Sequence, residues 1–462
     1  MHPNSPTPPS RRDFLKTTGS IAAVSALAGV AVPKVHAGED NTIQIALIGC
    51  GGRGTGAAAD AMSVKNGPVK LVAMADAFQD RLNASYDGIK KEFSAQVDVP
   101  DDRKFVGLDG YKKAIDCLKP GDVAIFGTPL GFRAPHFEYA IEKGVNAFME
   151  KPLTADGPSS RRMLKLAEDA SAKNLKVAVG LMSRHARPLQ QLADRIHNGD
   201  IGDVILMRCY RMHGPIVGFY PKKPAEMSEV EFQIRRFHAF IWASGGIFSD
   251  FYIHVIDHCC WMKDAWPVTA QAIGGRQYRN DANGAPCVDQ NFDTYGVEYT
   301  FADGSKMVLD GRAIVGCQEF YHSFAHGSKG SAIISKSGDC GAPSSIYKGQ
   351  LPKKADRVWE SQTPAGEDNP YRNEWNDLVD AIRADKPYNE AKRGIEASLV
   401  TSMGRFAAHT GVEVSYDEML NSDQDYAPNV DKLAMDGPAP VMPDAEGRYP
   451  IPQPGIVTKR EY

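Results

Sequence analysis

The sequence predicts an α/β protein that begins with a doubly wound parallel sheet of the Rossmann type and continues into a second α/β domain. Three observations lead to this prediction. Short apolar runs alternate with helix-like stretches across residues 41–182, the first run ends at a glycine-rich turn, and shorter strand-like runs follow across residues 183–421. At 462 residues the chain is also too long for one ordinary core. We therefore expect two domains.

Each apolar run of the first domain is expected to form a strand, because parallel strands covered by helices on both faces need no polar alternation. These runs cover residues 43–48, 69–75, 123–126, 145–149 and 177–180. A helix of small residues is expected directly after the first run, at 55–64. Helix-patterned sequence also separates the later runs, which is the order typical of crossover connections.

The second domain has shorter strand-like runs, punctuated by turn signals. Its expected strands and helices cover residues 201–207, 295–300, 306–310, 331–335, 374–384 and 394–411. A long gap between strands, residues 221–246, indicates an excursion near the substrate side. Prolines are dense in the last part, so we expect residues 422–462 to form an extended tail that lies across a neighbouring subunit.

The first 37 residues have the pattern of a twin-arginine signal peptide. Arg11 and Arg12 precede a weakly apolar run at 17–32, and residues 35–37 offer a small-x-small cleavage site. This pattern predicts export to the periplasm in the folded state. The alternative interpretation is an uncleaved membrane anchor. After cleavage, no apolar run of about 20 residues would remain to span a membrane.

Charge and cysteine spacing exclude two classes of site. The formal net charge of −4 gives no basic footprint for nucleic acid. The cysteines form no CxxC pair, and the histidines His254 and His258 have no third ligand spaced to complete a metal site. We therefore expect neither a nucleic-acid partner nor a metal.

A GxGxxG turn follows the first expected strand and opens the first expected helix. Gly49 would allow the tight turn, Gly51 the close approach of a pyrophosphate, and Gly54 the packing of helix on strand. Gly52 and Arg53 lie within the same turn. Because a helix N-terminus attracts a diphosphate, this segment predicts a dinucleotide site that includes all five residues.

Asp76 stands at the end of the second expected strand, about 20 residues beyond the turn, where an acid hydrogen-bonds the ribose of a dinucleotide. Its negative charge would repel a 2′-phosphate. NAD is therefore favoured over NADP as the cofactor. The alternative interpretation of Asp76 is a helix cap.

Polar residues follow the third expected strand at the edge where a ligand binds such sheets. Thr128 and Pro129 come directly after the strand, and Arg133 and His136 stand in the next segment. Thr128, Pro129 and His136 are predicted to contact the cofactor. The alternative is a capped helix with solvated Arg133 and His136.

The triplet Glu150-Lys151-Pro152 ends the next expected strand at that same edge. An ammonium group in this position would stand beside a hydroxyl whose carbon loses a hydride. Farther along, Asp250 and His254 are four residues apart, so one helical face presents both. A carboxylate beside an imidazole raises its basicity, as deprotonation of a hydroxyl requires, although such a pair is also common as a purely structural contact.

With these residues, the chain resembles the Gfo/Idh/MocA family, which includes glucose-fructose oxidoreductase and inositol dehydrogenase. The likeness covers roughly residues 41–421 and rests on the glycine turn, Asp76, Thr128-Pro129, Glu150-Lys151-Pro152 and the run Gly-Gly-x-x-x-Asp-x-x-x-His at 245–254. The resemblance implies a C-terminal α/β domain with an open, mainly antiparallel sheet. It also implies oligomer contacts on the outer face of that sheet, and hence a homo-oligomer, a dimer or tetramer.

The resemblance further implies roles for individual side chains. Lys151 would position and polarise the reacting hydroxyl, His254 would exchange the proton, and Asp250 would hold that imidazole. Glu150 would lie near the nicotinamide, as part of the cofactor site together with Lys151.

Arg184 matches a position near the substrate in the family, and Trp242 opens the stretch that ends at His254, so we predict that both contact the substrate. The sequence departs from the family at Phe251-Tyr252-Ile253, which is bulkier than the small residues often found there. This departure is expected to reshape the substrate pocket.

The sequence thus predicts an exported NAD-dependent oxidoreductase that transfers a hydride between a carbohydrate or polyol carbon, in a sugar or cyclitol, and a tightly bound nicotinamide. One alternative is an NAD-dependent glycoside hydrolase that works by transient oxidation and elimination. That branch of the family tends to lack the lysine of the triplet, so Lys151 favours a dehydrogenase. A second alternative is a non-catalytic sugar-binding protein that has kept the fold.

Overall fold

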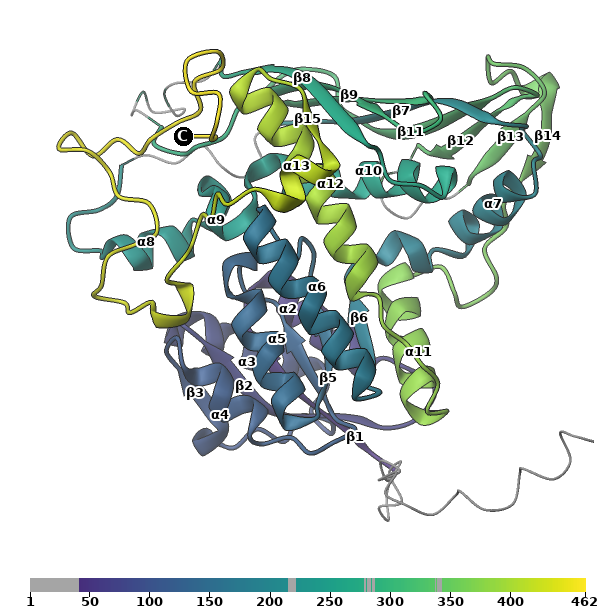
Figure 1. Cartoon of the computed structure of the whole chain (residues 1–462). Coiled ribbons are helices and arrows are strands. Elements are labelled where there is room, and N and C mark those ends of the chain that lie inside the picture. The colour runs from purple at the N-terminus through teal and green to yellow at the C-terminus, as the bar shows by residue number, and fades with distance from the viewer. Residues whose placement is uncertain are drawn as a thin grey trace, which may run out of the picture.

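Two β-sheets, one parallel and one mainly antiparallel, organise the protein (Figure 1). The structure is a computed structural model, and it describes residues 41–214, 222–277, 280, 284, 287–336, 338 and 343–462. The predicted signal peptide, residues 1–37, lies outside the described residues. Within the described residues, no helix combines the length and the apolar character needed to cross a membrane.

The first sheet has six strands, all parallel, in the order β3-β2-β1-β4-β5-β6. The strands are β1 Ile43–Ile48, β2 Val69–Asp76, β3 Lys104–Val106, β4 Val123–Phe126, β5 Asn146–Met149 and β6 Val177–Val179. The predicted doubly wound parallel sheet is confirmed. Strand β3 was not predicted, because its three residues are only partly buried or exposed and form no apolar run.

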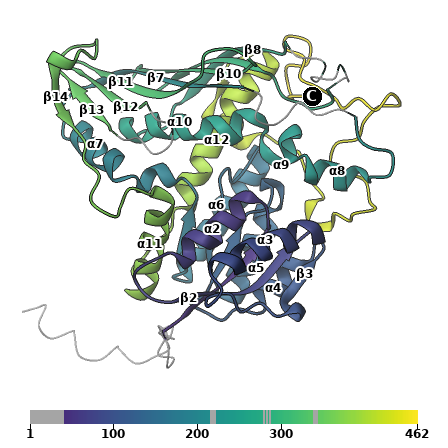
Figure 2. The same cartoon turned by 180° about the vertical axis from the view of Figure 1, so that it is seen from behind.

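Helices cover both faces of this sheet. They are α2 Gly52–Met62, α3 Gln79–Glu92, α4 Gly110–Ile115, α5 Arg133–Lys143 and α6 Gly157–Ala172. Apolar side chains of α4, α5 and α6 form one core with one face of the sheet, and those of α2 and α3 form another core with the opposite face. Figure 1 shows α5 and α6 in front of the sheet, and Figure 2 shows α2 and α3 on the other side.

Two helices from the end of the chain join the two sheets. Helix α11, Pro370–Arg383, packs beside α2 and α3, where the Trp375 ring stacks on Phe148 of β5 at 4.6 Å between ring centroids. Helix α12, Ala391–Thr410, contributes apolar side chains to a core of each sheet. The prediction that the helix at 374–384 belongs to the second domain is therefore wrong, because its apolar face completes the first.

The second sheet has nine strands in the order β14-β13-β12-β11-β7-β10-β9-β8-β15. They are β7 Val204–His213, β8 Thr269–Gly275, β9 Thr294–Thr300, β10 Lys306–Ala313, β11 Phe320–Gly327, β12 Ser331–Ser335, β13 Ser345–Tyr347, β14 Arg357–Glu360 and β15 Val414–Ser415. All neighbours pair antiparallel except β7 and β10, which confirms the predicted open, mainly antiparallel sheet.

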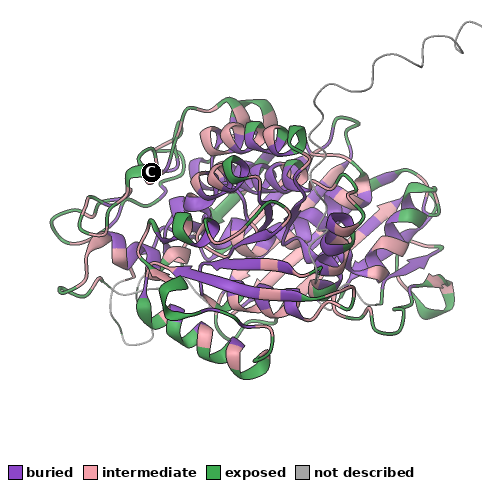
Figure 3. Ribbon diagram, turned by 90° about the horizontal axis from the view of Figure 1, so that it is seen from below, coloured by how far each residue is buried: buried purple, intermediate pink, exposed green. Residues whose placement is uncertain are grey.

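The inner face of this sheet packs on α10, Gly246–Lys263, and on α7, Arg187–His197. Between β7 and α10 the chain forms α8, Glu229–Arg235, the 3-10 helix η4, Phe237–Ala239, and α9, Ile241–Ser244. Buried residues concentrate along the strands and on the inward sides of the helices (Figure 3). The described part of the predicted excursion, residues 222–246, therefore contains three short helices and leads into α10.

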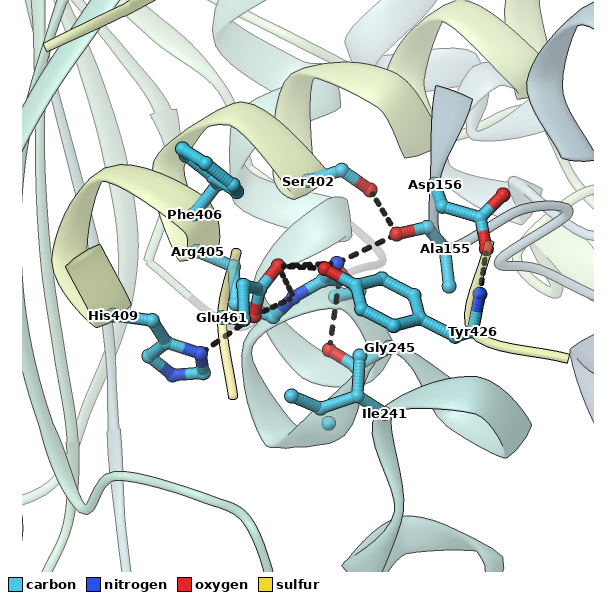
Figure 4. A network of polar contacts seen from close by, with 12 residues as sticks. Ala155, Asp156, Ile241, Gly245, Ser402, Arg405, Phe406, His409, Tyr426 and Glu461 are labelled. Atoms are coloured by element: carbon cyan, nitrogen blue, oxygen red, sulfur yellow. Dashed lines mark hydrogen bonds and ion pairs between the residues drawn. The ribbon is translucent and has the colours of Figure 1, made fainter. Parts of the chain in front are cut away.

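After α13, Tyr416–Asn421, the tail at 422–462 runs without a further α-helix or strand among the described residues, as predicted. Part of the tail packs on its own chain, and its predicted contact with a neighbouring subunit stays a prediction. Glu461 is fully buried against Arg405 of α12, whose Nε donates to both carboxylate oxygens at 3.0 Å. His409 and the hydroxyl of Tyr426 complete this network (Figure 4).

Candidate active site

The glycine turn joins β1 to α2 with the backbone packing that its spacing predicts. Gly49 has a φ of +92°, and a Cβ atom there would lie 2.6 Å from the carbonyl carbon of Gly127. A Cβ on Gly54 would lie 2.0 Å from the oxygen of Gly49. By contrast, no atom lies within 4 Å of a Cβ built on Gly51 or Gly52. The turn therefore packs tightly on one side and is open on the other, which fits a dinucleotide pyrophosphate.

The open side of the turn faces a cavity of about 320 Å³ at the carboxyl ends of the parallel strands. The predicted cofactor residues that line it are Gly49, Gly51, Gly52, Arg53, Asp76, Thr128, Pro129, His136, Glu150 and Lys151. Gly54 packs behind the turn instead. The fold thus brings residues from five separate segments to one cavity.

Asp76, the last residue of β2, both anchors the turn and faces the cavity. One carboxylate oxygen accepts the N–H of Cys50 at 2.7 Å, and the other accepts the N–H of Phe78 at 2.9 Å. Burial raises the pKa of Asp76, and these two hydrogen bonds oppose that change. Phe78 precedes α3, so Asp76 also stabilises the entry to that helix. A carboxylate has further lone pairs, which leaves capacity to accept from a ribose hydroxyl.

Arg133 and His136 are both buried, so the alternative of two solvated side chains is wrong. The Arg133 guanidinium donates to the carbonyl oxygens of Phe126 and Thr128, at 2.5 and 3.0 Å. Burial, followed by the charge of Arg133, lowers the pKa of His136 to about 3. His136 therefore presents a neutral imidazole to the cavity, with Nδ1 at 3.3 Å from the hydroxyl of Thr128.

Glu150 is held by Arg53 across the cavity wall. The Nε and Nη2 atoms of Arg53 donate to Glu150 Oε1 at 3.1 and 3.0 Å, and the guanidinium lies 4.5 Å from the ring centroid of Tyr371. This contact links the glycine turn to the end of β5. It fixes the carboxylate one residue before Lys151.

Lys151, Asp250 and His238 form a connected polar group at the cavity. The Nζ atom of Lys151 donates to the backbone oxygen of Asp250 at 2.6 Å and to its Oδ1 at 3.1 Å. His238 Nε2 lies 3.1 Å from Asp250 Oδ2. Burial favours the neutral acid, but the Lys151 ammonium and His238 outweigh burial and hold the pKa of Asp250 well below its usual range. Asp250 is therefore a carboxylate that bridges an ammonium and an imidazole.

The predicted pairing of Asp250 with His254 is wrong. The Asp250 carboxylate contacts Lys151 and His238, and among the described residues His254 Nδ1 is buried without a hydrogen-bond partner. Both residues share one helical face, but the Asp250 carboxylate accepts hydrogen bonds from groups outside this helix, the Lys151 ammonium and the His238 imidazole. His254 does not line the cavity, and burial followed by the nearby Lys151 charge lowers its pKa far below the usual range.

His238 was missed in the sequence analysis. It lies within the excursion at 221–246, in η4, and has no spacing relation to Lys151 or Asp250 that would have singled it out. Its only indication was its location in a segment that was expected near the substrate. The two elements meet in space because η4 packs directly against α10.

Arg184 and Trp242 lie away from the cavity, so their location does not support the predicted substrate contacts. Arg184 donates to both oxygens of Asp257, at 2.9 and 2.7 Å, and is mostly buried. Trp242 is 1% exposed, and its indole N–H donates to Gln233 at 2.8 Å. Both residues stabilise the elements behind the site.

Four curated relatives match the chain in sequence, whereas no protein-family model matches it. Inositol 2-dehydrogenase of Rhizobium meliloti (strain 1021) is 26% identical over 292 residues, which covers 63% of this chain and 74% of that protein. Inositol 2-dehydrogenase 4 of Saccharopolyspora erythraea is 34% identical over 113 residues, 23% of this chain. The chain spans only 33% of the length of that enzyme.

Solved structures share the fold over most of the chain. Levoglucosan dehydrogenase, in complex with NADH and levoglucosan, is 18% identical with a TM-score of 0.62, and myo-inositol 2-dehydrogenase from Lactobacillus plantarum is 23% identical with a TM-score of 0.57. Each comparison covers 81% of this chain and 99% of the other. These structures show that the fold is shared. The names of the two inositol dehydrogenases matched in sequence agree with the predicted class of enzyme, an oxidoreductase.

Proposed function

We propose that the chain is an NAD-dependent oxidoreductase that transfers a hydride between the carbon of a sugar or cyclitol hydroxyl and a tightly bound nicotinamide. The single observation that carries this proposal is the Lys151 ammonium, which lies in the same cavity as the glycine turn and is held by Asp250. An amine at the end of a strand is common on protein surfaces. A buried amine that is paired with a carboxylate beside a dinucleotide cradle is the arrangement that hydroxyl oxidation requires.

The residues of the glycine turn, with Asp76, Thr128 and Glu150, would hold the dinucleotide. The likeness in fold to levoglucosan dehydrogenase, whose structure contains NADH, supports a nicotinamide cofactor. Asp76 supports NAD over NADP, because its carboxylate would repel a 2′-phosphate. When bound, the nicotinamide supplies the hydride acceptor or donor.

The chain's own groups would act on the hydroxyl. The Lys151 ammonium can donate a hydrogen bond to the reacting oxygen and stabilise negative charge that develops there. Asp250 holds the Lys151 side chain in place. His238 shares the same carboxylate and lines the cavity, so its imidazole is placed to exchange a proton. Proton transfer of this kind contributes on the order of 10²–10⁴ in rate.

The first test is the variant Lys151→Ala. Removal of the ammonium should abolish turnover with a panel of sugars and cyclitols, while the dinucleotide stays bound, because the glycine turn and Asp76 are untouched. NADH absorbance measures turnover, and mass spectrometry of the denatured protein detects the bound cofactor.

Normal turnover by Lys151→Ala would contradict the role of the lysine. Purification without dinucleotide and no absorbance change with any sugar would favour a non-catalytic binding protein. Release of nitrophenol from nitrophenyl glycosides without net NADH would favour the hydrolase. Each outcome therefore separates one alternative from the proposal.

Export to the periplasm is part of the same proposal, supported by Arg11 and Arg12 before a short apolar run. Twin-arginine export moves folded proteins, so a cofactor bound in the cytoplasm would travel with the chain. Replacement of both arginines by lysine should leave the protein in the cytoplasmic fraction, as immunoblots of cell fractions would show. Unchanged periplasmic recovery would overturn this part.

A further inference from the structure

A group of side chains from β7 and α10 adjoins the reacting end of the cavity. We call it the Phe251 cluster: Arg211, His213, Phe251 and His254. The Phe251 ring lies 5.9 Å from the ring of His238, which lines the cavity, and 5.4 Å from the ring of His213. The Arg211 guanidinium lies 5.8 Å from the centroid of the same ring. The cluster therefore continues the site from His238 toward the antiparallel sheet.

The polar groups of this cluster have few partners. Within the described part of the chain, the Arg211 side chain makes no ion pair or hydrogen bond, and its guanidinium lies over the Tyr321 ring at 4.1 Å. The buried atoms Arg211 Nε, His213 Nε2 and His254 Nδ1 all lack a hydrogen-bond partner. Buried polar atoms are normally satisfied, so several unsatisfied ones together indicate a place where a ligand or water binds.

The charges around the cluster are unbalanced. Lys151 and Arg211 are both cationic, and Asp250 is the carboxylate that pairs with Lys151. The charge of Glu319 favours a higher pKa of His213, but this carboxylate is exposed and accepts the N–H of Gly214 at 3.1 Å. Arg211 thus keeps a positive charge that no described carboxylate neutralises by an ion pair. A half-buried cation of this kind stabilises a bound anion.

The histidines of the cluster do not supply a compensating charge. Burial, and then positive neighbours that include Arg211, lower the pKa values of His213 and His254. Both imidazoles are therefore neutral. His213 donates its N–H from Nδ1 to the carbonyl oxygen of Gly214 at 2.5 Å, whereas His254 can donate one hydrogen bond to a ligand. Arg211 is the fixed charge of the cluster, and its planar fork matches the two oxygens of an oxyanion.

We propose that the substrate carries an anionic oxygen substituent, a carboxylate or a phosphate, which binds to Arg211 in the Phe251 cluster while the reacting hydroxyl lies at Lys151. This inference rests on the proposed function, since it names the class of substrate for the same site. A sugar acid fits the arrangement, because its hydroxyl would lie at Lys151 while its acid group would reach Arg211 beside Phe251, whose ring lies next to His238. The phosphates of the cofactor have a separate place at the glycine turn.

The experiment compares matched substrates on the purified protein supplied with NAD. Each hexose is tested beside its uronate and its 6-phosphate, and kcat/KM is measured from NADH formation. We expect the wild type to prefer one anionic series over the neutral hexoses. Arg211→Gln should lower kcat/KM for that series by about 10- to 100-fold, the range of one charged hydrogen-bonded contact, with little change for neutral sugars. Arg211→Lys should retain part of the preference.

Arg208→Gln is the matched control. Arg208 lies on the same strand three residues earlier, so its side chain points to the opposite face, where its Nε contacts His326. Its replacement should leave both substrate series unchanged. Equal effects of Arg208→Gln and Arg211→Gln would overturn the proposal, because a general change in charge would then explain them.

Binding gives a readout that does not need turnover. Isothermal titration of the wild type with hexuronates and with hexose phosphates should show affinity that falls with added salt and is lost in Arg211→Gln. Equal affinity for neutral and anionic sugars would overturn the inference and leave the oxidoreductase intact. Absence of both a dinucleotide and NADH formation would overturn the oxidoreductase, while salt-dependent uronate or phosphate binding at Arg211 would still support the anion site.

Discussion

At the scale of single residues, the site depends on which imidazole shares the Asp250 carboxylate. His238 Nε2 lies 3.1 Å from Asp250 Oδ2, whereas His254 Nδ1 is buried without a partner in the described structure. A histidine that is oriented by a carboxylate is the more effective proton acceptor. We therefore expect His238, instead of His254, to exchange the proton.

This difference predicts unequal effects of two substitutions. His238→Asn should lower kcat by about 100-fold, because a proton acceptor at the cavity is lost. His254→Asn should act mainly on KM, through the substrate side of the site. Steady-state kinetics over a range of pH, with the cofactor content of each variant as the control for folding, measures both effects. A larger loss of kcat in His254→Asn would restore the original assignment.

The residues of the dinucleotide site could be predicted closely from the sequence, whereas the acid–base residues could not. Glycine spacing and strand ends are local patterns, and the sheet brings those ends together. His238 is related to Asp250 only by the packing of η4 on α10, which no periodicity encodes. For Trp242 and Arg184 the sequence analysis predicted contact with the substrate. Neither side chain lines the cavity, and both pack in the elements around it.

At the scale of elements, the tail is held by a buried ion pair. Arg405 and Glu461 are both 0% exposed, and Arg405 also donates to the backbone oxygen of Ala155 at 2.6 Å. The ion pair thus connects α12, the segment before α6 and the tail. The prolines predicted an extended tail, but no sequence pattern indicates that an acid near residue 461 pairs with one arginine of α12.

Removal of the acid should destabilise the fold in a pH-dependent way. Burial opposes ionisation of Glu461, but Arg405 and His409 lower its pKa from 4.5 to about 2. The stabilisation is therefore present above pH 4.5 and is lost as the pH falls toward about 2. Glu461→Gln should lower the free energy of unfolding by about 3 kcal/mol at neutral pH, with a difference that shrinks below pH 4.5.

Urea unfolding at several pH values measures this effect. Asp444→Asn is the control, because Asp444 pairs with Arg448 on the surface, where an ion pair contributes little. An equal loss of unfolding free energy in the two variants would show that the buried Glu461 ion pair stabilises the fold no more than a surface pair.

The elements themselves were predicted with uneven success for a physical reason. Strands and helices with clear apolar patterns were expected near their observed bounds, among them β1, β2, α11 and α12. Strands β8, β11, β13, β14 and β15 were not expected. A pattern says that a helix has an apolar face but not which core that face joins, as α11 illustrates. Strand β3 is too short to carry a pattern at all.

At the scale of the whole molecule, the outer face of the antiparallel sheet remains uncovered by helices, since α7 and α10 pack on the inner face. Ile273 of β8 is 80% exposed there, and the rings of Tyr210, Phe320 and Phe324 lie near one another on β7 and β11. An apolar, open sheet face of this kind favours association. It supports the proposed homo-oligomer, a dimer or tetramer.

Ile273→Glu should therefore shift the protein toward the monomer, because a charge on the face would have to be buried on association. Light scattering coupled to size exclusion measures the mass. Ile456→Glu is the matched control, since Ile456 is 78% exposed on the tail and its replacement should leave the mass unchanged. A monomeric wild type would contradict the proposal directly.

Helix α12 lies at the junction of the two sheets and gives apolar side chains to the core beneath each. Because this one helix belongs to both cores, a change that loosens its packing on one sheet should also destabilise the other. Heat should therefore unfold both halves in one cooperative step, and a bound substrate should stabilise both.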